Sequence, residues 1–257
     1  MIITSFNVNS IKARLDILQN WLQEFQPDIV LLQETKTVDT DFPILEMEAT
    51  GYSVAYHGQK SYNGVAILSK HPIKDVSVGI PDFDDDQARY IQAEINNIVV
   101  GSVYLPNGNP VDSDKFPYKL RWMDALHAHM KKRLLPCEKP IALGGDFNLV
   151  PREIDCYNPE KLRNDAIFHD DALARFYAMK HLGFIDAWEV LHGADAPAFT
   201  YWDYVRARFD RDEGLRIDHF LLSASAADML MACDVDQTPR RKEKPSDHTP
   251  IWCKLEH

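Results

Sequence analysis

The segment Ile141-Ala-Leu-Gly-Gly-Asp-Phe-Asn148 carries the pattern on which the fold prediction rests. A short apolar run, typical of a buried strand, ends in an aspartate and an asparagine. Two earlier segments have the same form, because Ile2-Ile-Thr-Ser-Phe6 precedes Asn7 and Ile29-Val-Leu-Leu-Gln33 precedes Glu34. If the polar ends of these strands lie at one edge, residues far apart in the sequence meet around a single cleft.

A carboxylate also interrupts a later apolar run. Asp218 lies within Arg216-Ile-Asp-His-Phe-Leu-Leu222. A buried carboxylate is costly without a partner, so we expect Asp218 to face a cation, a metal ion or an imidazole. His248 is the candidate imidazole, because the adjacent Asp247 can fix its tautomer and favour its charged form.

Asp146 and Asn148 stand two residues apart after Gly144-Gly145, which we interpret as a turn. A tight loop of this kind aims both side chains the same way, and capping of an Asx turn is the alternative. Glu34, taken alone, is also consistent with a solvated loop. Together these residues offer oxygen ligands and one imidazole but no thiolate, a set that favours Mg²⁺, Mn²⁺ or Ca²⁺ over zinc. We therefore predict a cleft for phosphate chemistry.

The composition is that of a globular protein, with 257 residues, 45% hydrophobic residues and a formal net charge of −11. We expect a single domain over residues 1–257, because no linker or low-complexity stretch divides the chain. Without a basic leader or an apolar run of about 18 residues, the sequence predicts a cytoplasmic protein with no membrane partner. The negative charge argues against a protein that coats nucleic acid indiscriminately, since phosphate neutralisation drives such binding.

Two stretches depart from this acidic balance. Arg240-Arg-Lys-Glu-Lys244 lies just before Asp247 and His248, and residues 204–216 contain four arginines. Both stretches are consistent with solvated loops or with nucleic-acid contacts beside the cleft. The four cysteines are widely spaced, and we expect reduced packing residues.

Strand-like and helix-like segments alternate along the chain. Apolar periodicity predicts helices over residues 11–25, 115–134 and 171–182, each followed closely by a proline or glycine. Strands are predicted over residues 52–56, 65–69, 76–80, 90–95 and 98–104. Five consecutive strands without a long helix favour an antiparallel meander. The expected architecture is two packed sheets with helices outside.

The sequence also excludes several enzyme classes. It contains no G-x-S-x-G elbow, no G-x-x-x-x-G-K-[ST] loop, no G-x-G-x-x-G and no H-E-x-x-H. The histidines other than His248 lack metal-like spacing, and we interpret them as surface or packing residues.

Six motifs occur in order along the chain: Ser5-Phe-Asn-Val-Asn9, Leu32-Gln-Glu-Thr-Lys36, Tyr56-His-Gly-Gln-Lys60, Gly145-Asp-Phe-Asn148, Gly214-Leu-Arg-Ile-Asp218 and Lys244-Pro-Ser-Asp-His-Thr-Pro250. Together they resemble the exonuclease III family of abasic-site endonucleases, in the endonuclease/exonuclease/phosphatase superfamily. The resemblance implies a DNase I-like, four-layer α/β sandwich of two mixed sheets flanked by helices. It also implies Mg²⁺ dependence, with Mn²⁺ as a substitute, incision of DNA 5′ to abasic sites, and 3′-to-5′ exonuclease and 3′-phosphatase activities.

The same resemblance implies roles for individual residues. Glu34 looks like the principal metal ligand, with Asn7 and Asn9 nearby, and Asp247 would assist the metal or the histidine. The residues that would act on the substrate are Tyr104, Asp146, Asn148, Asp218 and His248. Asp146 would orient or deprotonate the attacking water and Asn148 would hold the scissile phosphate. Asp218 would pair with His248, which contacts a phosphate oxygen, while the Tyr104 phenol would stabilise the pentacoordinate phosphate or the leaving oxygen.

Two positions depart from the family pattern. Asn9 stands where animal relatives carry an aspartate, so the metal site has one charge fewer. Tyr201-Trp-Asp-Tyr204 replaces the bacterial Trp-Phe-Asp-Tyr beside the pocket for the base-less sugar, so Tyr201 and Trp202 are predicted to form its wall, with core packing as the alternative. The other residues expected to contact DNA are Lys60, Tyr62, Asn63, Arg89, Arg240, Arg241 and Lys242.

The expected partner is double-stranded DNA with abasic sites or blocked 3′ ends, bound by a monomer. Another phosphoesterase of the same superfamily, such as a sphingomyelinase, an inositol polyphosphate phosphatase or a secreted deoxyribonuclease, is the alternative enzyme. The segments Gly214–Asp218 and Tyr201–Tyr204 favour abasic DNA over these substrates. A non-catalytic nucleic-acid-binding regulator on the same scaffold is a further alternative, which the presence of every named catalytic residue disfavours.

Overall fold

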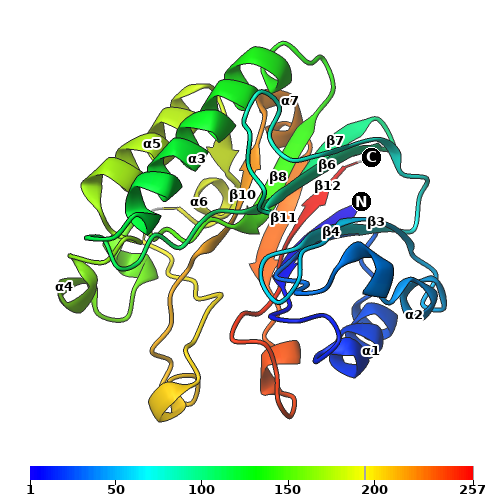
Figure 1. The fold of residues 1–257 in the computed structure, drawn as a ribbon, viewed down its shortest axis with the longest axis horizontal. Coiled ribbons are helices and arrows are strands. Elements are labelled where there is room, and N and C mark those ends of the chain that lie inside the picture. The colour runs from blue at the N-terminus through cyan, green and yellow to red at the C-terminus, as the bar shows by residue number, and fades with distance from the viewer. Residues whose placement is uncertain (194, 257) are drawn as a thin grey trace.

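Two β-sheets pack face to face in the computed structural model, and helices cover their outer faces (Figure 1). The structure describes residues 1–193 and 195–256, and in these residues twelve strands form two six-stranded sheets. The first sheet has the strand order β11 (Leu230–Val235), β12 (Ile251–Leu255), β1 (Ile2–Asn7), β2 (Ile29–Gln33), β4 (Val65–Ser69) and β3 (Ser53–His57). The second sheet has the order β5 (Lys74–Val78), β6 (Tyr90–Ile95), β7 (Ile98–Tyr104), β8 (Ile141–Asp146), β10 (Asp218–Leu222) and β9 (Ile185–Asp186).

The helices lie outside the two sheets. They are α1 (Leu15–Phe25), α2 (Ile44–Glu48), α3 (Lys115–His129), α4 (Pro159–Leu162), α5 (Asp170–His181), α6 (Ala187–His192) and α7 (Ala224–Ala227). A π-helical turn, η2 (Met130–Leu134), extends α3, and short 3₁₀ turns are η1 (Asp39–Asp41), η3 (Glu153–Asp155), η4 (Val205–Ala207) and η5 (Pro239–Arg241). Both sheets are mixed, because β1 pairs in parallel with β2 and β7 with β8, while other neighbouring strands are antiparallel. The predicted four-layer sandwich of two mixed sheets is therefore confirmed.

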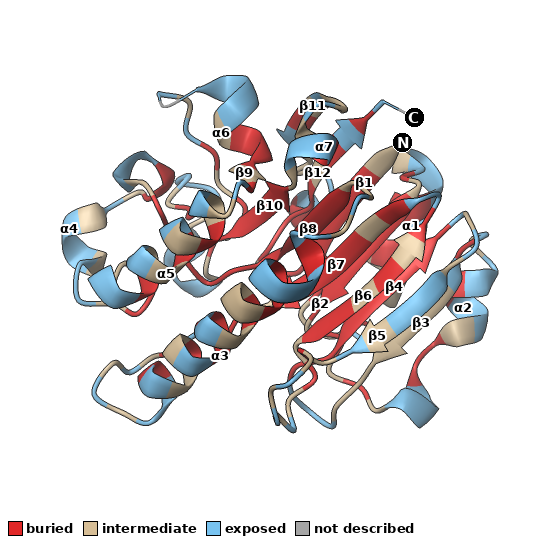
Figure 2. Ribbon diagram, turned by 90° about the horizontal axis from the view of Figure 1, so that it is seen from above, coloured by how far each residue is buried: buried red, intermediate tan, exposed pale blue. Residues whose placement is uncertain are grey.

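The central strands are mostly apolar because both of their faces are buried (Figure 2). In β2, Ile29 and Leu31 join the core between the two sheets, whereas Val30 and Leu32 face the core beneath α1. Side chains alternate across a strand, so a strand covered on both sides needs apolar residues at every position. This explains why such runs show no polar alternation.

The amphipathic helices supply the two outer cores. Leu18, Trp21 and Leu22 of α1 pack against the first sheet. Residues from α3 and α5, including Trp122 and Phe176, pack against the second. The three predicted helices are confirmed as α1, α3 with its π-helical turn, and α5, although α1 begins at Leu15 rather than at residue 11.

Three local predictions differ from the structure. The five consecutive strands do not form one meander, because β3 and β4 belong to the first sheet and β5, β6 and β7 to the second; strand patterning carries no information about which sheet a strand joins. The strand predicted over residues 76–80 is β5, Lys74–Val78. Gly144 and Gly145 are not a turn but the last part of β8.

The two glycines permit close packing inside the sandwich. A Cβ on Gly145 would lie 1.9 Å from the Val103 carbonyl oxygen, and one on Gly144 would lie 2.4 Å from the Phe220 ring. The cysteines are free thiols, as predicted. Among the described residues, no helix has the length and apolarity needed to cross a membrane.

We predict that Gly145→Ala lowers the free energy of unfolding by about 3 kcal/mol, because the clash is with backbone on the parallel neighbour β7 and cannot be relieved by a rotamer change. Gly183→Ala is the control, since nothing lies within 4 Å of its added Cβ. Its positive φ should cost about 1 kcal/mol. Urea unfolding measures both values, and equal losses in the two variants would contradict the packing argument.

Candidate active site

The two sheets bring the predicted catalytic residues to one edge of the molecule. In the first sheet, Asn7 at the end of β1 pairs with Gln33 at the end of β2, directly before Glu34. In the second sheet, Asp146 at the end of β8 has Tyr104 of β7 opposite it on one side and Asp218 of β10 on the other. Strand register therefore places Asn7 beside the strand that leads to Glu34 in one sheet, and Tyr104, Asp146 and Asp218 side by side in the other.

Asn7 connects the two sheets at this edge. Its buried Nδ2 donates hydrogen bonds to Glu34 Oε1 at 2.8 Å and to Asp146 Oδ2 at 3.0 Å. Its Oδ1 accepts the Asn9 backbone N–H at 3.1 Å. One carboxamide thus sets the spacing between a carboxylate of the first sheet and one of the second.

A cationic side chain lies among the predicted metal ligands. Lys36 Nζ contacts Glu34 Oε2 at 2.8 Å and Asn9 Oδ1 at 2.6 Å, and Asn9 Nδ2 donates to Asp247 Oδ1 at 2.9 Å. Burial by itself raises the pKa of Glu34, but the Lys36 ammonium and the Asn7 amide hold that pKa below its usual value. Glu34 is consequently an anion whose oxygens already bind a positive charge.

These side chains suit a divalent cation. Carboxylate oxygens of Glu34 and Asp146 lie within 4.8 Å of each other, and a ring nitrogen of His248 lies within the same distance of both. The buried Oδ1 of Asp218 has no hydrogen-bond partner among the described residues. Oxygen donors that already attract the Lys36 ammonium are the ligands that Mg²⁺ and Mn²⁺ prefer.

His248 lies between two aspartates. Its Nδ1 is 2.9 Å from Asp218 Oδ2, and its Nε2 is 3.7 Å from Asp146 Oδ2. Burial lowers the pKa of His248, but the charges of Asp218 and Asp146 outweigh it and raise the pKa to about 10. The ring is therefore an imidazolium at neutral pH, able to donate a proton or a hydrogen bond from Nε2.

Asp146 has the properties of a general base. Burial raises its pKa to about 7, and the Asp218 and Glu34 carboxylates act in the same direction. The His248 charge and the Asn148 backbone N–H, which donates to Asp146 Oδ1 at 2.9 Å, oppose this rise. A carboxylate with a pKa near neutrality accepts a proton from water more readily than an ordinary aspartate does.

Tyr104 completes this group from β7. The Arg89 guanidinium lies over its ring, 4.7 Å from the centroid. Burial, followed by the charges of Glu34 and Asp146, raises the pKa of the Tyr104 phenol well above its usual value. The phenol stays protonated and can donate a hydrogen bond to an anionic oxygen.

Asn148 is held at both ends of its carboxamide. Its Nδ2 donates to the Leu105 carbonyl at 2.9 Å, and its Oδ1 accepts from Asn107 Nδ2 at 3.1 Å. Sequence reasoning missed Asn107, although the polar Asn107 follows Tyr104 by three residues in the same loop and lines the same pocket. Its position beside the end of a strand, like that of Asn148, is the signal that would have found it.

A pocket of about 420 Å³ opens over these residues. Its lining includes Glu34, Tyr104, Asp146, Asn148, Asp247 and His248. Tyr201 also lines it, with its ring 5.0 Å from that of His248. Trp202 does not, because its ring is fully buried and packs edge-on against Phe199 and Phe209. Core packing, the alternative for Trp202, is its role in the structure.

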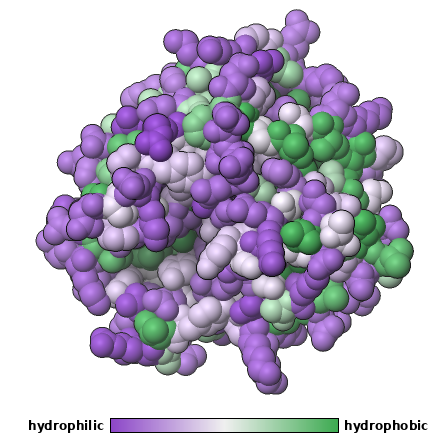
Figure 3. All heavy atoms as spheres, in the orientation of Figure 1, coloured by the Kyte–Doolittle hydropathy of each residue, from purple (hydrophilic) through white to green (hydrophobic). Residues whose placement is uncertain are grey.

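Two further pockets adjoin the catalytic one, because each shares lining residues with it. Hydrophilic residues make up most of the molecular surface visible in Figure 3. On one side, a pocket of about 540 Å³ is lined by Tyr62, Asn63 and Arg89 and shares Tyr104 with the catalytic pocket. Tyr62 is 71% exposed, whereas Asn63 is buried and its Nδ2 donates to the side chains of Gln59 and Gln87. Lys60 is exposed nearby in the sequence but does not line this pocket.

On the other side, a pocket of about 430 Å³ lies between the loops that carry η4 and η5, which project together from the lower edge in Figure 1. Arg241 and Lys242 line it and are exposed. Arg240 is a correction, because it is buried, donates to the Trp202 carbonyl at 3.0 Å and stacks over Phe209. It supports the loop rather than offering a free charge.

Arg216 is a second residue whose role the sequence did not indicate. It is fully buried, and its guanidinium donates to Asp155 at 2.7 Å and to Asp186 at 2.8 Å. The arginines of residues 204–216 therefore do not form one surface patch. Two acidic partners far away in the sequence leave no local signal.

An asparagine, a glutamate, two aspartates and a histidine at the joined ends of two packed mixed sheets define the class of metal-dependent phosphoesterases. The family model described as "Endonuclease/Exonuclease/phosphatase family" matches residues 4–248. The chain belongs to this family, within its exonuclease III group.

The relatives are nucleases. Exodeoxyribonuclease III of Haemophilus influenzae is 33% identical, over 98% of this chain and 98% of its own. The 3′ phosphatase NExo from Neisseria, solved with a product DNA hairpin, superposes with a TM-score of 0.96 at 38% identity over the full length of both chains. An AP endonuclease from Archaeoglobus fulgidus gives a TM-score of 0.95 at 37% identity, also over both full chains. These likenesses identify a DNA-repair nuclease.

We predict that kcat/KM falls with acidity well above pH 3.8, the ordinary pKa of an aspartate, because Asp146 must be a carboxylate to accept a proton and its pKa is raised. A rate–pH profile at constant saturating Mg²⁺ measures this midpoint. Asp84→Asn, which removes an exposed carboxylate, should leave the midpoint unchanged. A profile that is flat from about pH 8 to about pH 5 would contradict the assignment.

Proposed function

We propose that this chain is a Mg²⁺-dependent nuclease that hydrolyses the phosphodiester 5′ to abasic sites in duplex DNA and removes blocking groups and nucleotides from 3′ ends. One observation carries the proposal most directly: Asp146, with its raised pKa, lies between Glu34 and the Asp218–His248 pair in one pocket. A monomer and a cytoplasmic location stay predictions from the sequence.

Each residue of the pocket has its own role in the hydrolysis. Asp146 accepts a proton from water as the water oxygen attacks phosphorus, and the bond from phosphorus to the 3′ oxygen breaks. The His248 imidazolium and the carboxamides of Asn148 and Asn107 bind the phosphate oxygens, whose negative charge grows in the transition state. The Tyr104 phenol donates to the leaving or the equatorial oxygen.

The metal would be held by Glu34, with Asn7, Asn9 and Asp247 arranged around it. Bound there, a divalent cation supplies charge stabilisation to the phosphate and lowers the pKa of water. A positioned base alone contributes about 10² to 10⁴ in rate. Phosphate ester hydrolysis requires far more, so most of the acceleration must come from charges that this site preorganises.

The DNA backbone would cross the three connected pockets. Arg89 and Tyr62 lie on one side of the catalytic pocket, and Arg241 and Lys242 on the other. A net charge of −11 would repel DNA on average. These cationic side chains lie beside the site, where they would attract the DNA backbone locally.

A second candidate places the main activity at 3′ ends rather than at internal abasic sites. It is favoured by the close superposition on a relative described as a 3′ phosphatase. Both reactions break a bond from phosphorus to a 3′ oxygen, so the same residues serve either. Three duplexes separate them: one with an internal abasic analogue, one with a nick bearing a 3′-phosphate, and one intact.

We predict that Glu34→Ala lowers kcat/KM on the preferred duplex by about 10³-fold or more, because it removes the principal metal ligand. Glu48→Ala, at an exposed glutamate on α2, is the control and should retain activity. Excess EDTA should abolish cleavage by the unaltered enzyme and added Mg²⁺ should restore it. Cleavage that persists in EDTA would rule out the proposed mechanism.

We predict that replacing Arg241 and Lys242 together by glutamine weakens DNA binding and reduces the slope of log K against log salt by about 1.8, from the loss of two phosphate contacts. Fluorescence anisotropy across a salt series measures the slope. Lys131→Gln with Lys132→Gln makes the same charge change in the π-helical turn η2, at the opposite end of the molecule from the η5 loop (Figure 1). Equal slopes in the two double variants would refute a specific role for the η5 loop.

A further inference from the structure

Lys119 is a buried cation beneath the active site that the proposed mechanism does not use. It lies on α3, and none of its surface is exposed. Its aliphatic stem runs under Gly108, where an added Cβ would lie 2.7 Å from Lys119 Cδ. An ammonium is costly to bury unless its three N–H groups are all satisfied, so the identity of their acceptors decides what the residue does.

The three acceptors are backbone carbonyls on three different loops. Lys119 Nζ donates to the carbonyls of Asn148 at 2.8 Å, Asn107 at 3.1 Å and Ala166 at 3.1 Å. The first loop follows β8, the second follows β7, and the third connects α4 to α5. Each loop contributes a side chain to the catalytic pocket, namely Asn148, Asn107 and Ile167. One cation therefore fixes the spacing of three pocket walls.

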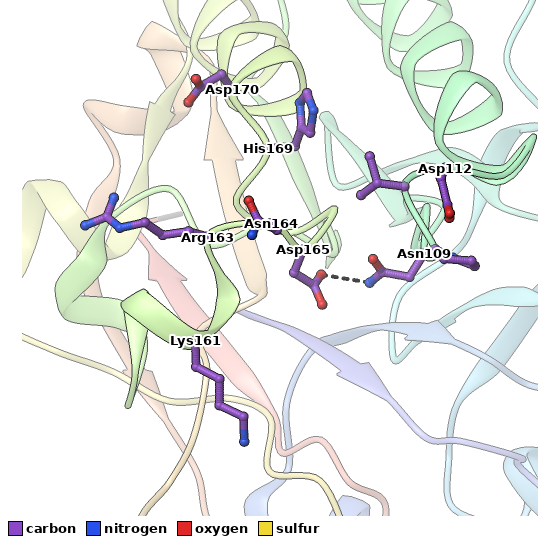
Figure 4. Close-up of a pocket in the computed structure, with 10 residues that line it drawn as sticks. Asn109, Asp112, Lys161, Arg163, Asn164, Asp165, His169 and Asp170 are labelled. Carbon is purple, nitrogen blue, oxygen red and sulfur yellow. Dashed lines mark hydrogen bonds between the residues drawn. The ribbon is translucent and has the colours of Figure 1, made fainter.

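Side-chain bonds nearer the surface join the same loops. Asn109 Nδ2 donates to Asp165 Oδ1 at 2.7 Å, and Asn109 Oδ1 accepts the Ala166 backbone N–H at 3.1 Å. Figure 4 shows Asn109 and Asp165 facing each other across the lining of a neighbouring polar pocket of about 790 Å³. These segments are neither helix nor strand and lack the regular backbone hydrogen bonds of those elements. Side-chain hydrogen bonds hold them in place instead.

Two opposing effects act on the protonation of Lys119. Burial lowers the pKa of Lys119 to about 7, and the nearby charges of Asp146 and Asp165 oppose that change. The carboxylates of the site thus help to keep the ammonium protonated, and the protonated ammonium has the three donors that the three carbonyls need.

We propose that Lys119 is a positioning residue for the hydrolysis described above, acting through Asn148 and Asn107, whose carboxamides it holds toward the phosphate. The inference rests on the proposed function. A displacement of about 1 Å at a substrate-binding group can cost about 10²-fold in rate, so a clamp of this kind matters for kcat without touching substrate.

Lys119→Met tests the proposal, because it keeps the stem and removes the donors. We expect kcat to fall by roughly 30-fold while KM changes by less than about threefold. His129→Leu is the matched control on the same helix: its ring is buried, and its hydrogen-bond partners, Gln92 at 2.8 Å and Tyr90 at 3.4 Å, lie in β6 rather than in the three loops. It should lose stability but keep kcat within about twofold. An equal loss of kcat in both variants would overturn the proposal.

A double-mutant cycle with Asn148→Ala separates positioning from general destabilisation. If Lys119 acts mainly through this loop, Lys119→Met should cost no more than about threefold in the Asn148→Ala background. The same cost in both backgrounds would contradict the proposal. If the methionine variant does not fold, Lys119→Arg and Lys119→Gln replace it. The proposal then requires kcat to be highest in the unaltered enzyme, lower in Lys119→Arg and lowest in Lys119→Gln. Equal kcat values in the three proteins would contradict the proposal.

Hydrogen–deuterium exchange gives a readout that needs no activity. In Lys119→Met, amides of residues 105–109 and 147–150 should exchange faster, while His129→Leu should leave them unchanged. Unchanged exchange in Lys119→Met would refute the clamp even if the enzyme is active. A different result would refute the proposed function alone. In that case the unaltered protein cleaves none of the three duplexes, while Lys119→Met still speeds exchange in the loops.

Discussion

The structure depends on cations placed between carboxylates that would otherwise repel one another. Asp146 and Asp218 are opposite each other on neighbouring strands, and Glu34 approaches from the other sheet. Like charges in a poorly solvated interior are tolerated only with compensating partners. His248 provides this compensation between the two aspartates, and Lys36 provides it beside Glu34. Glu34 and Asp146 nevertheless differ in protonation, because the pKa of Glu34 is lowered while that of Asp146 is raised to about 7.

Three residues of the site have an unusual backbone conformation. Asn9, Glu34 and Asn148 adopt left-handed conformations, with φ of 44°, 52° and 47°. Such conformations cost energy for residues with a Cβ and persist where the surroundings impose them. In each case the residue directly follows or closely follows the end of a core strand. Glu34 and Asn148 line the catalytic pocket, and Asn9 bonds to Asp247, which also lines it.

The sequence predicted the parts of this arrangement that follow from local patterns. Apolar runs ending in Asn7, Glu34 and Asp146 located the site because strand ends in both sheets lie at one edge. The partition of consecutive strands between sheets was not predicted, since turns do not specify the sheet that a strand joins. Residues fixed by distant partners were also missed: Lys119 is held by three carbonyls and Arg216 by two distant aspartates, none of which leaves a local signal.

His248 is central to this site because it is an imidazolium at neutral pH, held between Asp218 and Asp146. Nitrogen-15 NMR of its ring in the unaltered protein tests this claim most directly. We expect both ring nitrogens to stay protonated at neutral pH and to lose a proton only near the raised pKa of about 10. A ring that loses its proton close to the ordinary histidine pKa of 6.5 would contradict it.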